Sequence, residues 1–324
     1  MIEINETNFP DANFRQHLLS QYYDKNGVLT DESIKWITVI DVDELGISSL
    51  KGIEYFTSLE ALYCSDNNLK DLDVSKNTKL QQLYCGGNEL TVLDVSNCTK
   101  LTRLGCDYNQ LTNLNVSNST ALVLLDCSNN QLSALDVSNC TKLTRLDCPE
   151  NQLTTLNVSG CLALKEIYCS YNQLTTLDVS SNVLLTKLDC CFNQLITLNI
   201  SNNIALADLN CYHNQLMALI CPKNIALTVL GCGANKLTTL DVSGCTALER
   251  FYFPHNRINK ASMDALIASL PQTGGKVYVY DNYDYKFKVD TYEDNICTKE
   301  QIAAIKAKGW TPYYFGGHGW VEYE

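Results

Sequence analysis

One spacing constrains this chain more than any other feature, because a leucine recurs at intervals of 21 residues in ten consecutive copies. These leucines are Leu59, Leu80, Leu101, Leu122, Leu143, Leu164, Leu185, Leu206, Leu227 and Leu248. Counted from each leucine as position 0, an apolar residue stands at +3 and an asparagine at +8, and nine copies carry a cysteine at +5. Self-similarity at a fixed period means that each repeat forms one unit that buries its apolar face against the next.

A second phrase is nested in every repeat and extends the same regularity. Leucines at +10 and +13 are followed by valine at +15, as in Leu174, Leu177 and Val179. A degenerate earlier copy begins at Ile37, 22 residues before Leu59, and raises the number of turns to eleven. The repeats therefore occupy residues 37–258.

The phrase LxxLxCxxNxL resembles the leucine-rich repeat, with cysteine in its third apolar position. Together with the LDVSxNTx phrase it is similar to a 21-residue bacterial subclass sometimes called IRREKO. The resemblance implies a mainly β solenoid, with one short parallel strand per coil lining a ligand-facing inner sheet. We expect strand-like segments on the opposite side as well, because the second phrase is β-branched and rich in turn residues.

The two ends are expected to cap the open turns of the solenoid. Residues 1–36 form a predicted helical cap, since Phe14, Leu18 and Tyr22 share one helical face. Residues 259–324 form a predicted α/β cap with helices over 260–270 and 298–310 and a strand over 276–281. The phrase TKEQIAAIKAKGW in this region resembles a cap found after such repeats in anaerobic gut bacteria.

Residues 22–33 resemble an EF-hand loop that has lost its ligands. If Gly27 is the sixth position, Tyr22 and Ser33 stand at the first and twelfth, where carboxylates are needed. The segment is predicted to be a remnant turn rather than a calcium site. Neither a metal nor another cofactor is expected in this chain.

Charge and hydropathy narrow the range of partners. The formal net charge is −12 with a sequence pI near 4.8, which leaves no basic stripe for a phosphate backbone and argues against nucleic acid. The apolar runs are far shorter than the roughly 18 residues of a membrane span. The first ten residues do not read as an export leader, so neither membrane insertion nor a signal peptide is predicted.

The cysteines at +5 are interpreted as packing groups. Parallel strands lie about 4.8 Å apart, more than the roughly 3.8 Å that Cβ atoms of a disulfide prefer. Val42 and Phe253 fill the same position at the two ends, and CxxC pairs typical of zinc sites are missing from the sequence. Cys140 and Cys161 share position +18 and could pair across adjacent turns, although unpaired turn thiols are the favoured interpretation. Thr298 and Gln301 have the spacing of a capping box. Cys297 precedes this box, where it can pack on Ile302 as a hydrophobic staple.

Sequence evidence for catalysis is slight. The chain has four histidines and lacks the GxSxG, HExxH and P-loop motifs. An enzymatic alternative rests only on Cys297 and His318. We therefore predict a non-catalytic protein.

The variable positions of the repeat indicate where a ligand binds. Positions +2, +4, +6 and +7 should face solvent on the inner sheet, and they are where the copies differ from one another. Three consecutive turns place aromatic and acidic residues there, and the candidate ligand-binding residues are Tyr168, Tyr171, Asp189, Phe192, Tyr212 and His213. Asp147 and Asp208 are expected to flank them. Aromatic clusters of this kind anchor peptides and also stack on sugars.

The sequence thus predicts a module that binds a host or bacterial surface protein through its inner sheet. Glycan binding and a scaffold without a specific ligand remain alternatives. The resemblance implies a secreted or cell-surface location. The many thiols argue mildly for the cytoplasmic alternative, because oxidising compartments favour disulfides.

Overall fold

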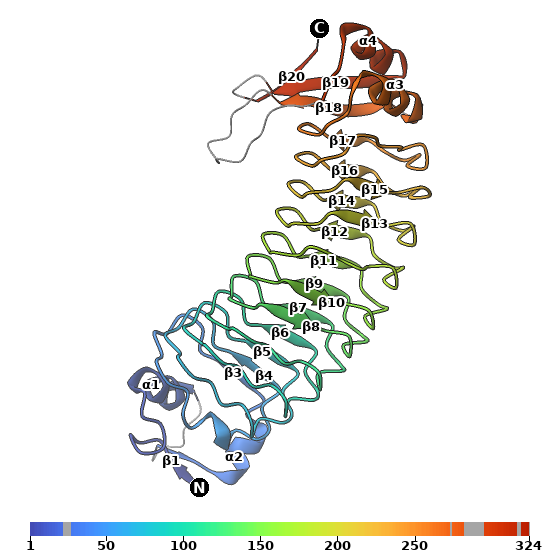
Figure 1. The fold of residues 1–324 in the computed structure, drawn as a ribbon. Coiled ribbons are helices and arrows are strands. Elements are labelled where there is room, and N and C mark those ends of the chain that lie inside the picture. The colour runs from blue at the N-terminus through green and yellow to red at the C-terminus, as the bar shows by residue number, and fades with distance from the viewer. Residues whose placement is uncertain (22–26, 273, 282–294, 316–318, 324) are drawn as a thin grey trace. The chain divides into compact units, whose positions relative to one another are not determined.

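The computed structural model describes residues 1–21, 27–272, 274–281, 295–315 and 319–323. The chain divides into two compact units, residues 1–163 and 164–324, which are described separately. Each consists largely of stacked coils of the repeat (Figure 1). The predicted solenoid fold is confirmed.

In residues 1–163, six three-residue strands lie in parallel, one for each turn. They are β3 (Val39–Asp41), β4 (Ala61–Tyr63), β5 (Gln82–Tyr84), β6 (Arg103–Gly105), β7 (Leu124–Asp126) and β9 (Arg145–Asp147). Equivalent positions of neighbouring turns are paired, as Leu83 with Leu104. On the other side of the coil, β8 (Ala134–Asp136) pairs in parallel with β10 (Thr155–Asn157). Strand segments therefore occur on both sides, as predicted.

In residues 164–324, the inner sheet continues beyond the last repeat into the cap. Five repeat strands are β11 (Glu166–Tyr168), β12 (Lys187–Asp189), β14 (Asp208–Asn210), β16 (Val229–Gly231) and β17 (Arg250–Tyr252). They are followed by β18 (Gly275–Asp281), β19 (Trp310–Phe315) and the antiparallel β20 (Trp320–Glu322). On the opposite side, β13 (Thr197–Asn199) pairs with β15 (Ala218–Ile220).

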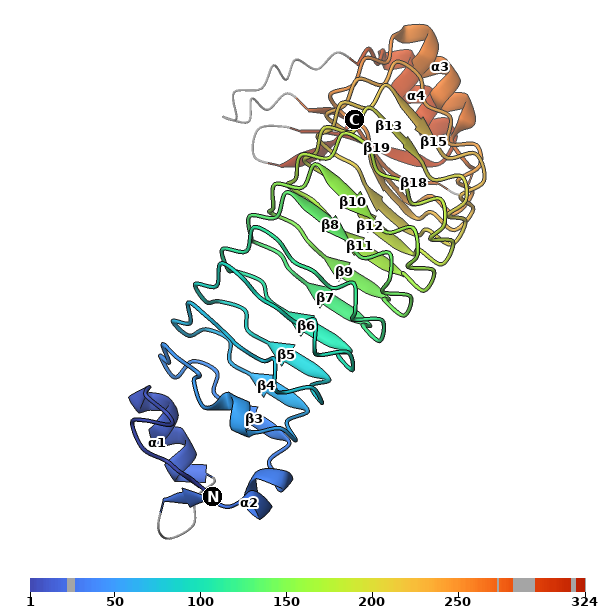
Figure 2. The same ribbon diagram turned by 60° about the horizontal axis from the view of Figure 1, so that its bottom comes forward.

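Two helices cover the cap strands, α3 (Lys260–Ser269) and α4 (Lys299–Ala307), which contact each other (Figure 2). The predicted capping box of α4 is present, since the Thr298 side chain accepts from the Gln301 amide and the Gln301 side chain accepts from the Thr298 amide. Strands β19 and β20 were not predicted from the sequence. Their strands follow no 21-residue spacing, so the repeat pattern could not reveal them.

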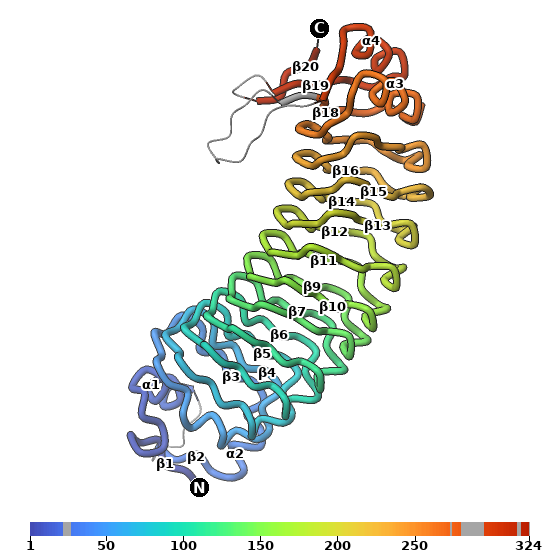
Figure 3. The backbone as a smooth tube through the Cα atoms, viewed as in Figure 1, coloured from blue at the N-terminus to red at the C-terminus, as the bar shows by residue number. Residues whose placement is uncertain are grey.

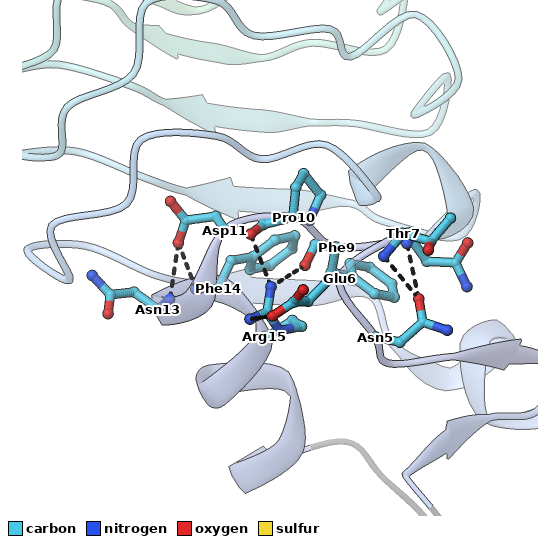
Figure 4. A network of polar contacts seen from close by, with 10 residues as sticks. Asn5, Glu6, Thr7, Phe9, Pro10, Asp11, Asn13, Phe14 and Arg15 are labelled. Atoms are coloured by element: carbon cyan, nitrogen blue, oxygen red, sulfur yellow. Dashed lines mark hydrogen bonds and ion pairs between the residues drawn. The ribbon is translucent and has the colours of Figure 1, made fainter.

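At the other end, α1 (Ala12–Gln21) and α2 (Asp31–Trp36) accompany a short antiparallel pair, β1 (Ile2–Glu3) and β2 (Val28–Leu29). Phe14 and Leu18 of α1 are buried, as the sequence predicts. Figure 4 shows that Asp11 caps α1 by accepting from the Asn13 and Phe14 amides at 2.9 and 3.0 Å. The Arg15 guanidinium donates to two backbone carbonyls before the helix, those of Phe9 and Pro10, both at 2.8 Å.

The EF-hand resemblance falls partly outside the described residues, since Tyr22 to Asn26 are not among them. Ser33, the expected twelfth position of that loop, has another task. Its hydroxyl accepts from the Thr30 amide at 2.9 Å and completes the capping box of α2.

A short 3₁₀ helix, η1 (Ile53–Tyr55), leads into the second turn.

Figure 3 shows the backbone of the stacked coils, and a buried asparagine at +8 joins neighbouring coils in the ten repeats that begin at Leu59. The Asn130 side-chain amide donates to the carbonyls of Cys106, Cys127 and Ser128 at 3.0, 3.2 and 3.1 Å. Its oxygen accepts from the Leu111 amide at 2.9 Å. One side chain thereby joins backbone groups of two successive turns. It is the acceptor for the buried Leu111 amide, whereas the Cys106 and Cys127 carbonyls also accept from the asparagines of neighbouring turns.

The cysteines at +5 form a ladder in the interior. All nine are fully buried: Cys64, Cys85, Cys106, Cys127, Cys148, Cys169, Cys190, Cys211 and Cys232. All sixteen cysteines of the chain retain thiols rather than disulfides, Cys140 and Cys161 included. Burial places the ladder sulfurs among the leucines, in agreement with a packing role.

Replacing Asn130 with alanine should lower the free energy of unfolding by about 3 kcal/mol, because the buried Leu111 amide loses its acceptor and three carbonyls each lose one of their hydrogen bonds. Urea unfolding at fixed pH measures the change. Asn139 is a matched control, since its exposed side chain makes one hydrogen bond, at 3.3 Å to the Ser117 carbonyl. Asn139→Ala should change stability by no more than about 0.5 kcal/mol. Equal effects would contradict the role assigned to the ladder.

Alkaline pH should destabilise the protein through the buried thiols. Burial, assisted by the charge of Asp107, raises the pKa of Cys85 to about 12, whereas an unfolded thiol titrates near about 8.5. Between these values the unfolded chain binds fewer protons, so the contribution of Cys85 is complete below the lower value and declines as pH rises. Urea midpoints from about pH 7 to pH 10 should fall, and less steeply in Cys85→Val, which places there the residue type found at Val42. An identical slope in both proteins would contradict this assignment.

Candidate functional site

The predicted site residues lie at the ends of consecutive inner strands in residues 164–324. Tyr168 and Asp189 end β11 and β12 at position +4, and Tyr212 stands at +6. Tyr171, Phe192 and His213 all occupy position +7, immediately before the buried asparagine. Residues that are 21 positions apart in the sequence therefore lie side by side on adjacent turns.

Position +7 has a backbone that suits glycine or asparagine better than an aromatic residue. Tyr171, Phe192 and His213 have φ values of 53°, 51° and 52°, in the left-handed region. This conformation costs an L-residue roughly 1–2 kcal/mol, and glycine escapes the cost. Gly87 and Asn129 occupy the same position elsewhere in the chain. The three rings are therefore held where the backbone does not favour them.

The three rings form a continuous stack. The centroids of Tyr171 and Phe192 lie 4.3 Å apart and those of Phe192 and His213 4.6 Å apart, with interplanar angles of 8° and 18°. Tyr212 packs edge-on against Phe192 at 5.8 Å. Tyr171 is 51% exposed, whereas the other three are half-buried. We call Tyr171, Phe192, Tyr212 and His213 the aromatic ridge.

Charged residues line the strands beside the ridge. The Lys187 ammonium lies 3.4 Å from the Asp208 carboxylate and 5.4 Å from the centroid of the Tyr168 ring. Burial lowers the pKa of Lys187, but Asp208 and Tyr168 outweigh this effect and raise it overall. Asp189 accepts from the Cys191 amide at 3.2 Å. Among the described residues Asp189 makes no ion pair, so this part of the sheet keeps a net negative charge.

An open pocket of about 470 Å³ adjoins the ridge. Phe192 and Tyr212 line one part of it, and Tyr252, Pro254 and Trp320 line another. Further lining residues include Lys187, Asp189, Asp208, Asn210 and Gly231. Gly231 occupies position +4 between Asn210 and Tyr252, and a Cβ there would lie 3.2 Å from the Asn210 side-chain oxygen. Because Gly231 has no side chain, the space above it remains part of the pocket.

The structure brings together some of the predicted residues more closely than others. Asp189, Phe192 and Tyr212 line the pocket, whereas Tyr168, Tyr171 and His213 lie outside its lining. The sequence predicts that position +6 faces solvent. This is wrong for at least one turn, because Cys191 at +6 is buried. Asp147 belongs to the other unit and is engaged by Arg145 at 2.7 Å.

The cap contributes aromatic residues that sequence reasoning did not include in the site. Tyr252, Tyr278 and Tyr313 stack across three paired strands, with centroid distances of 4.0 and 5.2 Å, and Trp320 meets Tyr278 edge-on at 4.9 Å. Burial raises the pKa of Tyr278 to about 12. Tyr252 and Tyr278 are register partners although 26 residues separate them. The 21-residue period therefore could not align them.

The described residues show no metal-binding group of three or more His, Cys, Asp or Glu side chains. Cys297 is half-buried, immediately before the N-cap of α4. His318, its suggested catalytic companion, lies outside the described residues.

Comparison with known proteins places these features in a family. Residues 9–130 match the family described as the LRR domain of endo-beta-N-acetylglucosaminidase EndoS. The functional domain of InlJ from Listeria monocytogenes, described as including a cysteine ladder, superposes on 86% of this chain with a TM-score of 0.75 and 34% identity. The chain is a bacterial leucine-rich repeat protein.

This leucine-rich repeat chain spans only part of the length of the InlJ relatives. It covers 60% of the solved InlJ chain. Internalin J of L. monocytogenes is 40% identical over 71 residues, which are 22% of this chain and 8% of that protein. An internalin of the same organism, InlF, has the same fold at 20% identity and a TM-score of 0.68, with 96% and 97% of the two chains covered.

None of the helices in the described ranges of this leucine-rich repeat protein combines the length and hydropathy that crossing a membrane requires.

Replacing Tyr171 with asparagine should leave the free energy of unfolding within about 1 kcal/mol of the wild type, because relief of the left-handed backbone offsets the lost ring contact. Tyr108→Asn is the matched control at the same position in the other unit, where φ is 47° and the side chain is 62% exposed. Thermal and urea unfolding provide the measurement. A loss of several kcal/mol in Tyr171→Asn alone would show that the ridge serves stability.

Proposed function

We propose that this protein is a non-catalytic binding module that holds a protein partner on its inner sheet, at the aromatic ridge and the adjoining pocket. The observation that carries the proposal is the left-handed backbone beneath Tyr171, Phe192 and His213. Residues kept in a costly conformation point to a role beyond folding. Glycine and asparagine at the same position elsewhere in this chain build the same turn.

The ridge and pocket have the properties of an interface centre. Stacked aromatic side chains offer a large contact area at little entropic cost, and aromatic residues dominate binding energy in protein interfaces. The pocket of about 470 Å³ can receive one large side chain of the partner. The unpaired charge of Asp189 and the net charge of −12 favour a partner surface that is neutral or basic.

The comparisons are consistent with a partner-binding role. Internalin-like leucine-rich repeat folds commonly serve as protein-interaction modules, and the likeness extends to a domain described as functional in InlJ. On the same basis we propose that the protein acts outside the bacterial cytoplasm, secreted or at the cell surface, and meets a host or bacterial protein there.

Glycan binding is a second candidate, favoured by one feature of the pocket. Aromatic faces from Phe192, Tyr212 and Tyr252 meet carboxylate and amide groups of Asp189, Asp208 and Asn210 around the same space. Such a combination can stack on a sugar ring and bind its hydroxyls. Competition with free oligosaccharides distinguishes the two candidates, since they would saturate a glycan-binding site but not a protein-binding site.

A triple variant, Tyr171→Asn, Phe192→Asn and His213→Asn, should lose at least about 100-fold in affinity for the partner, as expected for the loss of several interface anchors. The partner is first captured by the wild type from host-cell surface and bacterial-envelope extracts, then purified and titrated. Retention of binding by the triple variant, with its fold intact by circular dichroism, would contradict the proposed site.

The control for this experiment is Tyr108→Asn, which changes an exposed aromatic residue at the same repeat position in the other unit. It should bind as the wild type does. Protease treatment of the extract should abolish capture, whereas periodate oxidation of its sugars should not. The reverse pattern would favour the glycan candidate.

A further inference from the structure

One turn departs from the repeat on the side opposite the inner sheet. Position +15 is valine or isoleucine in the other full repeats, but in the turn beginning at Leu206 it is Cys221. Ile220 and Pro222, on either side, replace the usual aspartate or asparagine and the usual serine. These three residues do not belong to the aromatic ridge, and the 21-residue pattern does not explain why they differ.

The geometry of the repeat determines what faces position +15. Where the residue at +18 is asparagine or cysteine, its side chain can donate to the carbonyl of this residue in the turn before. Asn203 donates to Val179 at 2.9 Å, and Asn224 donates to Ile200 at 3.0 Å. Cysteines at +18 make the same contact, as do Cys140 to Val116 at 3.7 Å and Cys161 to Val137 at 3.0 Å. In these turns position +18 lies against +15 of the turn before.

Cys245 occupies +18 in the turn after Cys221, so this rule brings two thiols together. The Cys245 thiol donates to the Cys221 carbonyl at 3.9 Å, and the two side chains lie close enough for each to shift the pKa of the other. The Cys221 thiol further donates to the Asp241 carbonyl at 3.4 Å. Both cysteines are buried, with 3% and 0% of their surfaces exposed. In the other full repeats the residue at +18 is cysteine, asparagine or serine, and the residue at +15 of the turn before is valine or isoleucine.

We propose that Cys221 and Cys245 are a specific cross-linking site, which forms a disulfide between successive turns when the protein meets a disulfide oxidant. The ladder thiols differ because they lie in register on parallel strands, about 4.8 Å apart, where a disulfide is strained. This inference does not depend on the proposed binding function.

The chemistry is thiol–disulfide exchange, and Cys245 is the attacking group. The neighbouring Cys221 side chain lowers the pKa of Cys245 against the opposing effect of burial, so Cys245 reaches the reactive thiolate more readily than its partner. The Cys245 thiolate attacks one sulfur of an oxidised low-molecular-weight disulfide and releases one thiol. Cys221 then loses its proton and attacks the Cys245 sulfur, releasing the second thiol. Two protein thiols are oxidised, and one oxidant disulfide is reduced.

Burial means that the oxidant reaches these sulfurs during folding or when the turn opens locally. Once formed, the bond closes a loop between residues 221 and 245 and restricts the unfolded chain. It ties together two turns at the point where the repeat sequence is least regular. The expected consequence is a higher unfolding temperature for the oxidised protein.

Refolding the full chain from urea in a buffer of oxidised and reduced glutathione tests the proposal, because access is then not limiting. Remaining thiols are blocked with N-ethylmaleimide, and the protein is digested and mapped by mass spectrometry without reduction. We expect one dominant cross-linked peptide pair containing Cys221 and Cys245, with the other cysteines alkylated. Alkylation of both residues at every oxidant ratio, or equal cross-linking of Cys140 with Cys161, would overturn the proposal.

Cys221→Val is the matched control, because it restores the residue that other turns carry at +15. It should fold, show no dominant cross-link and unfold at the same temperature with and without oxidant, whereas the oxidised wild type gains several degrees. Cys245→Asn, which places at +18 the residue type of Asn224, is a second control if the first variant folds poorly. A gain of the same size in either variant would also overturn the proposal.

Discussion

The rest of the structure depends on the hydrogen bonds of the asparagine at +8. A solenoid coil turns sharply after its short strand, and this turn leaves backbone groups in the interior without strand partners. Asn193 supplies the missing partners, since its amide donates to three carbonyls and its oxygen accepts from the Leu174 amide. Because some of these groups belong to the preceding turn, the same side chain fixes the register between turns.

This constraint explains why the residue before the asparagine carries the candidate function. To bring the asparagine inward, the backbone at +7 adopts the left-handed conformation in every turn, whatever residue stands there. The side chains of Tyr108 and Tyr171 at +7 are then 62% and 51% exposed and contribute little to the core. A position that costs stability without filling the interior is available for a ligand, and in residues 164–324 it carries the ring stack of Tyr171, Phe192 and His213.

The same regularity governs the cysteines. At +5 the repeat needs a compact apolar group between leucines, and a protonated thiol meets that need while burial raises its pKa. The in-register strands separate these sulfurs by a full strand spacing and disfavour their oxidation to disulfides. Cys221 and Cys245 differ because they occupy two different positions that the coil geometry places in contact. The position of a cysteine within the coil, rather than its burial, decides its chemistry.

The sequence by itself determined the solenoid, the bounds of its turns, the burial of the +5 thiols and the capping box at Thr298, because each follows from residues at fixed short spacing. It also predicted that Tyr171, Phe192 and His213 would be neighbours, since a 21-residue period maps onto adjacent strands. Only the tertiary structure decided that Tyr252 and Trp320 share a pocket with Phe192, and that Tyr278 extends the sheet face beyond the last repeat. These contacts join the repeats to a cap without the period, and their register depends on packing between elements that no local spacing encodes.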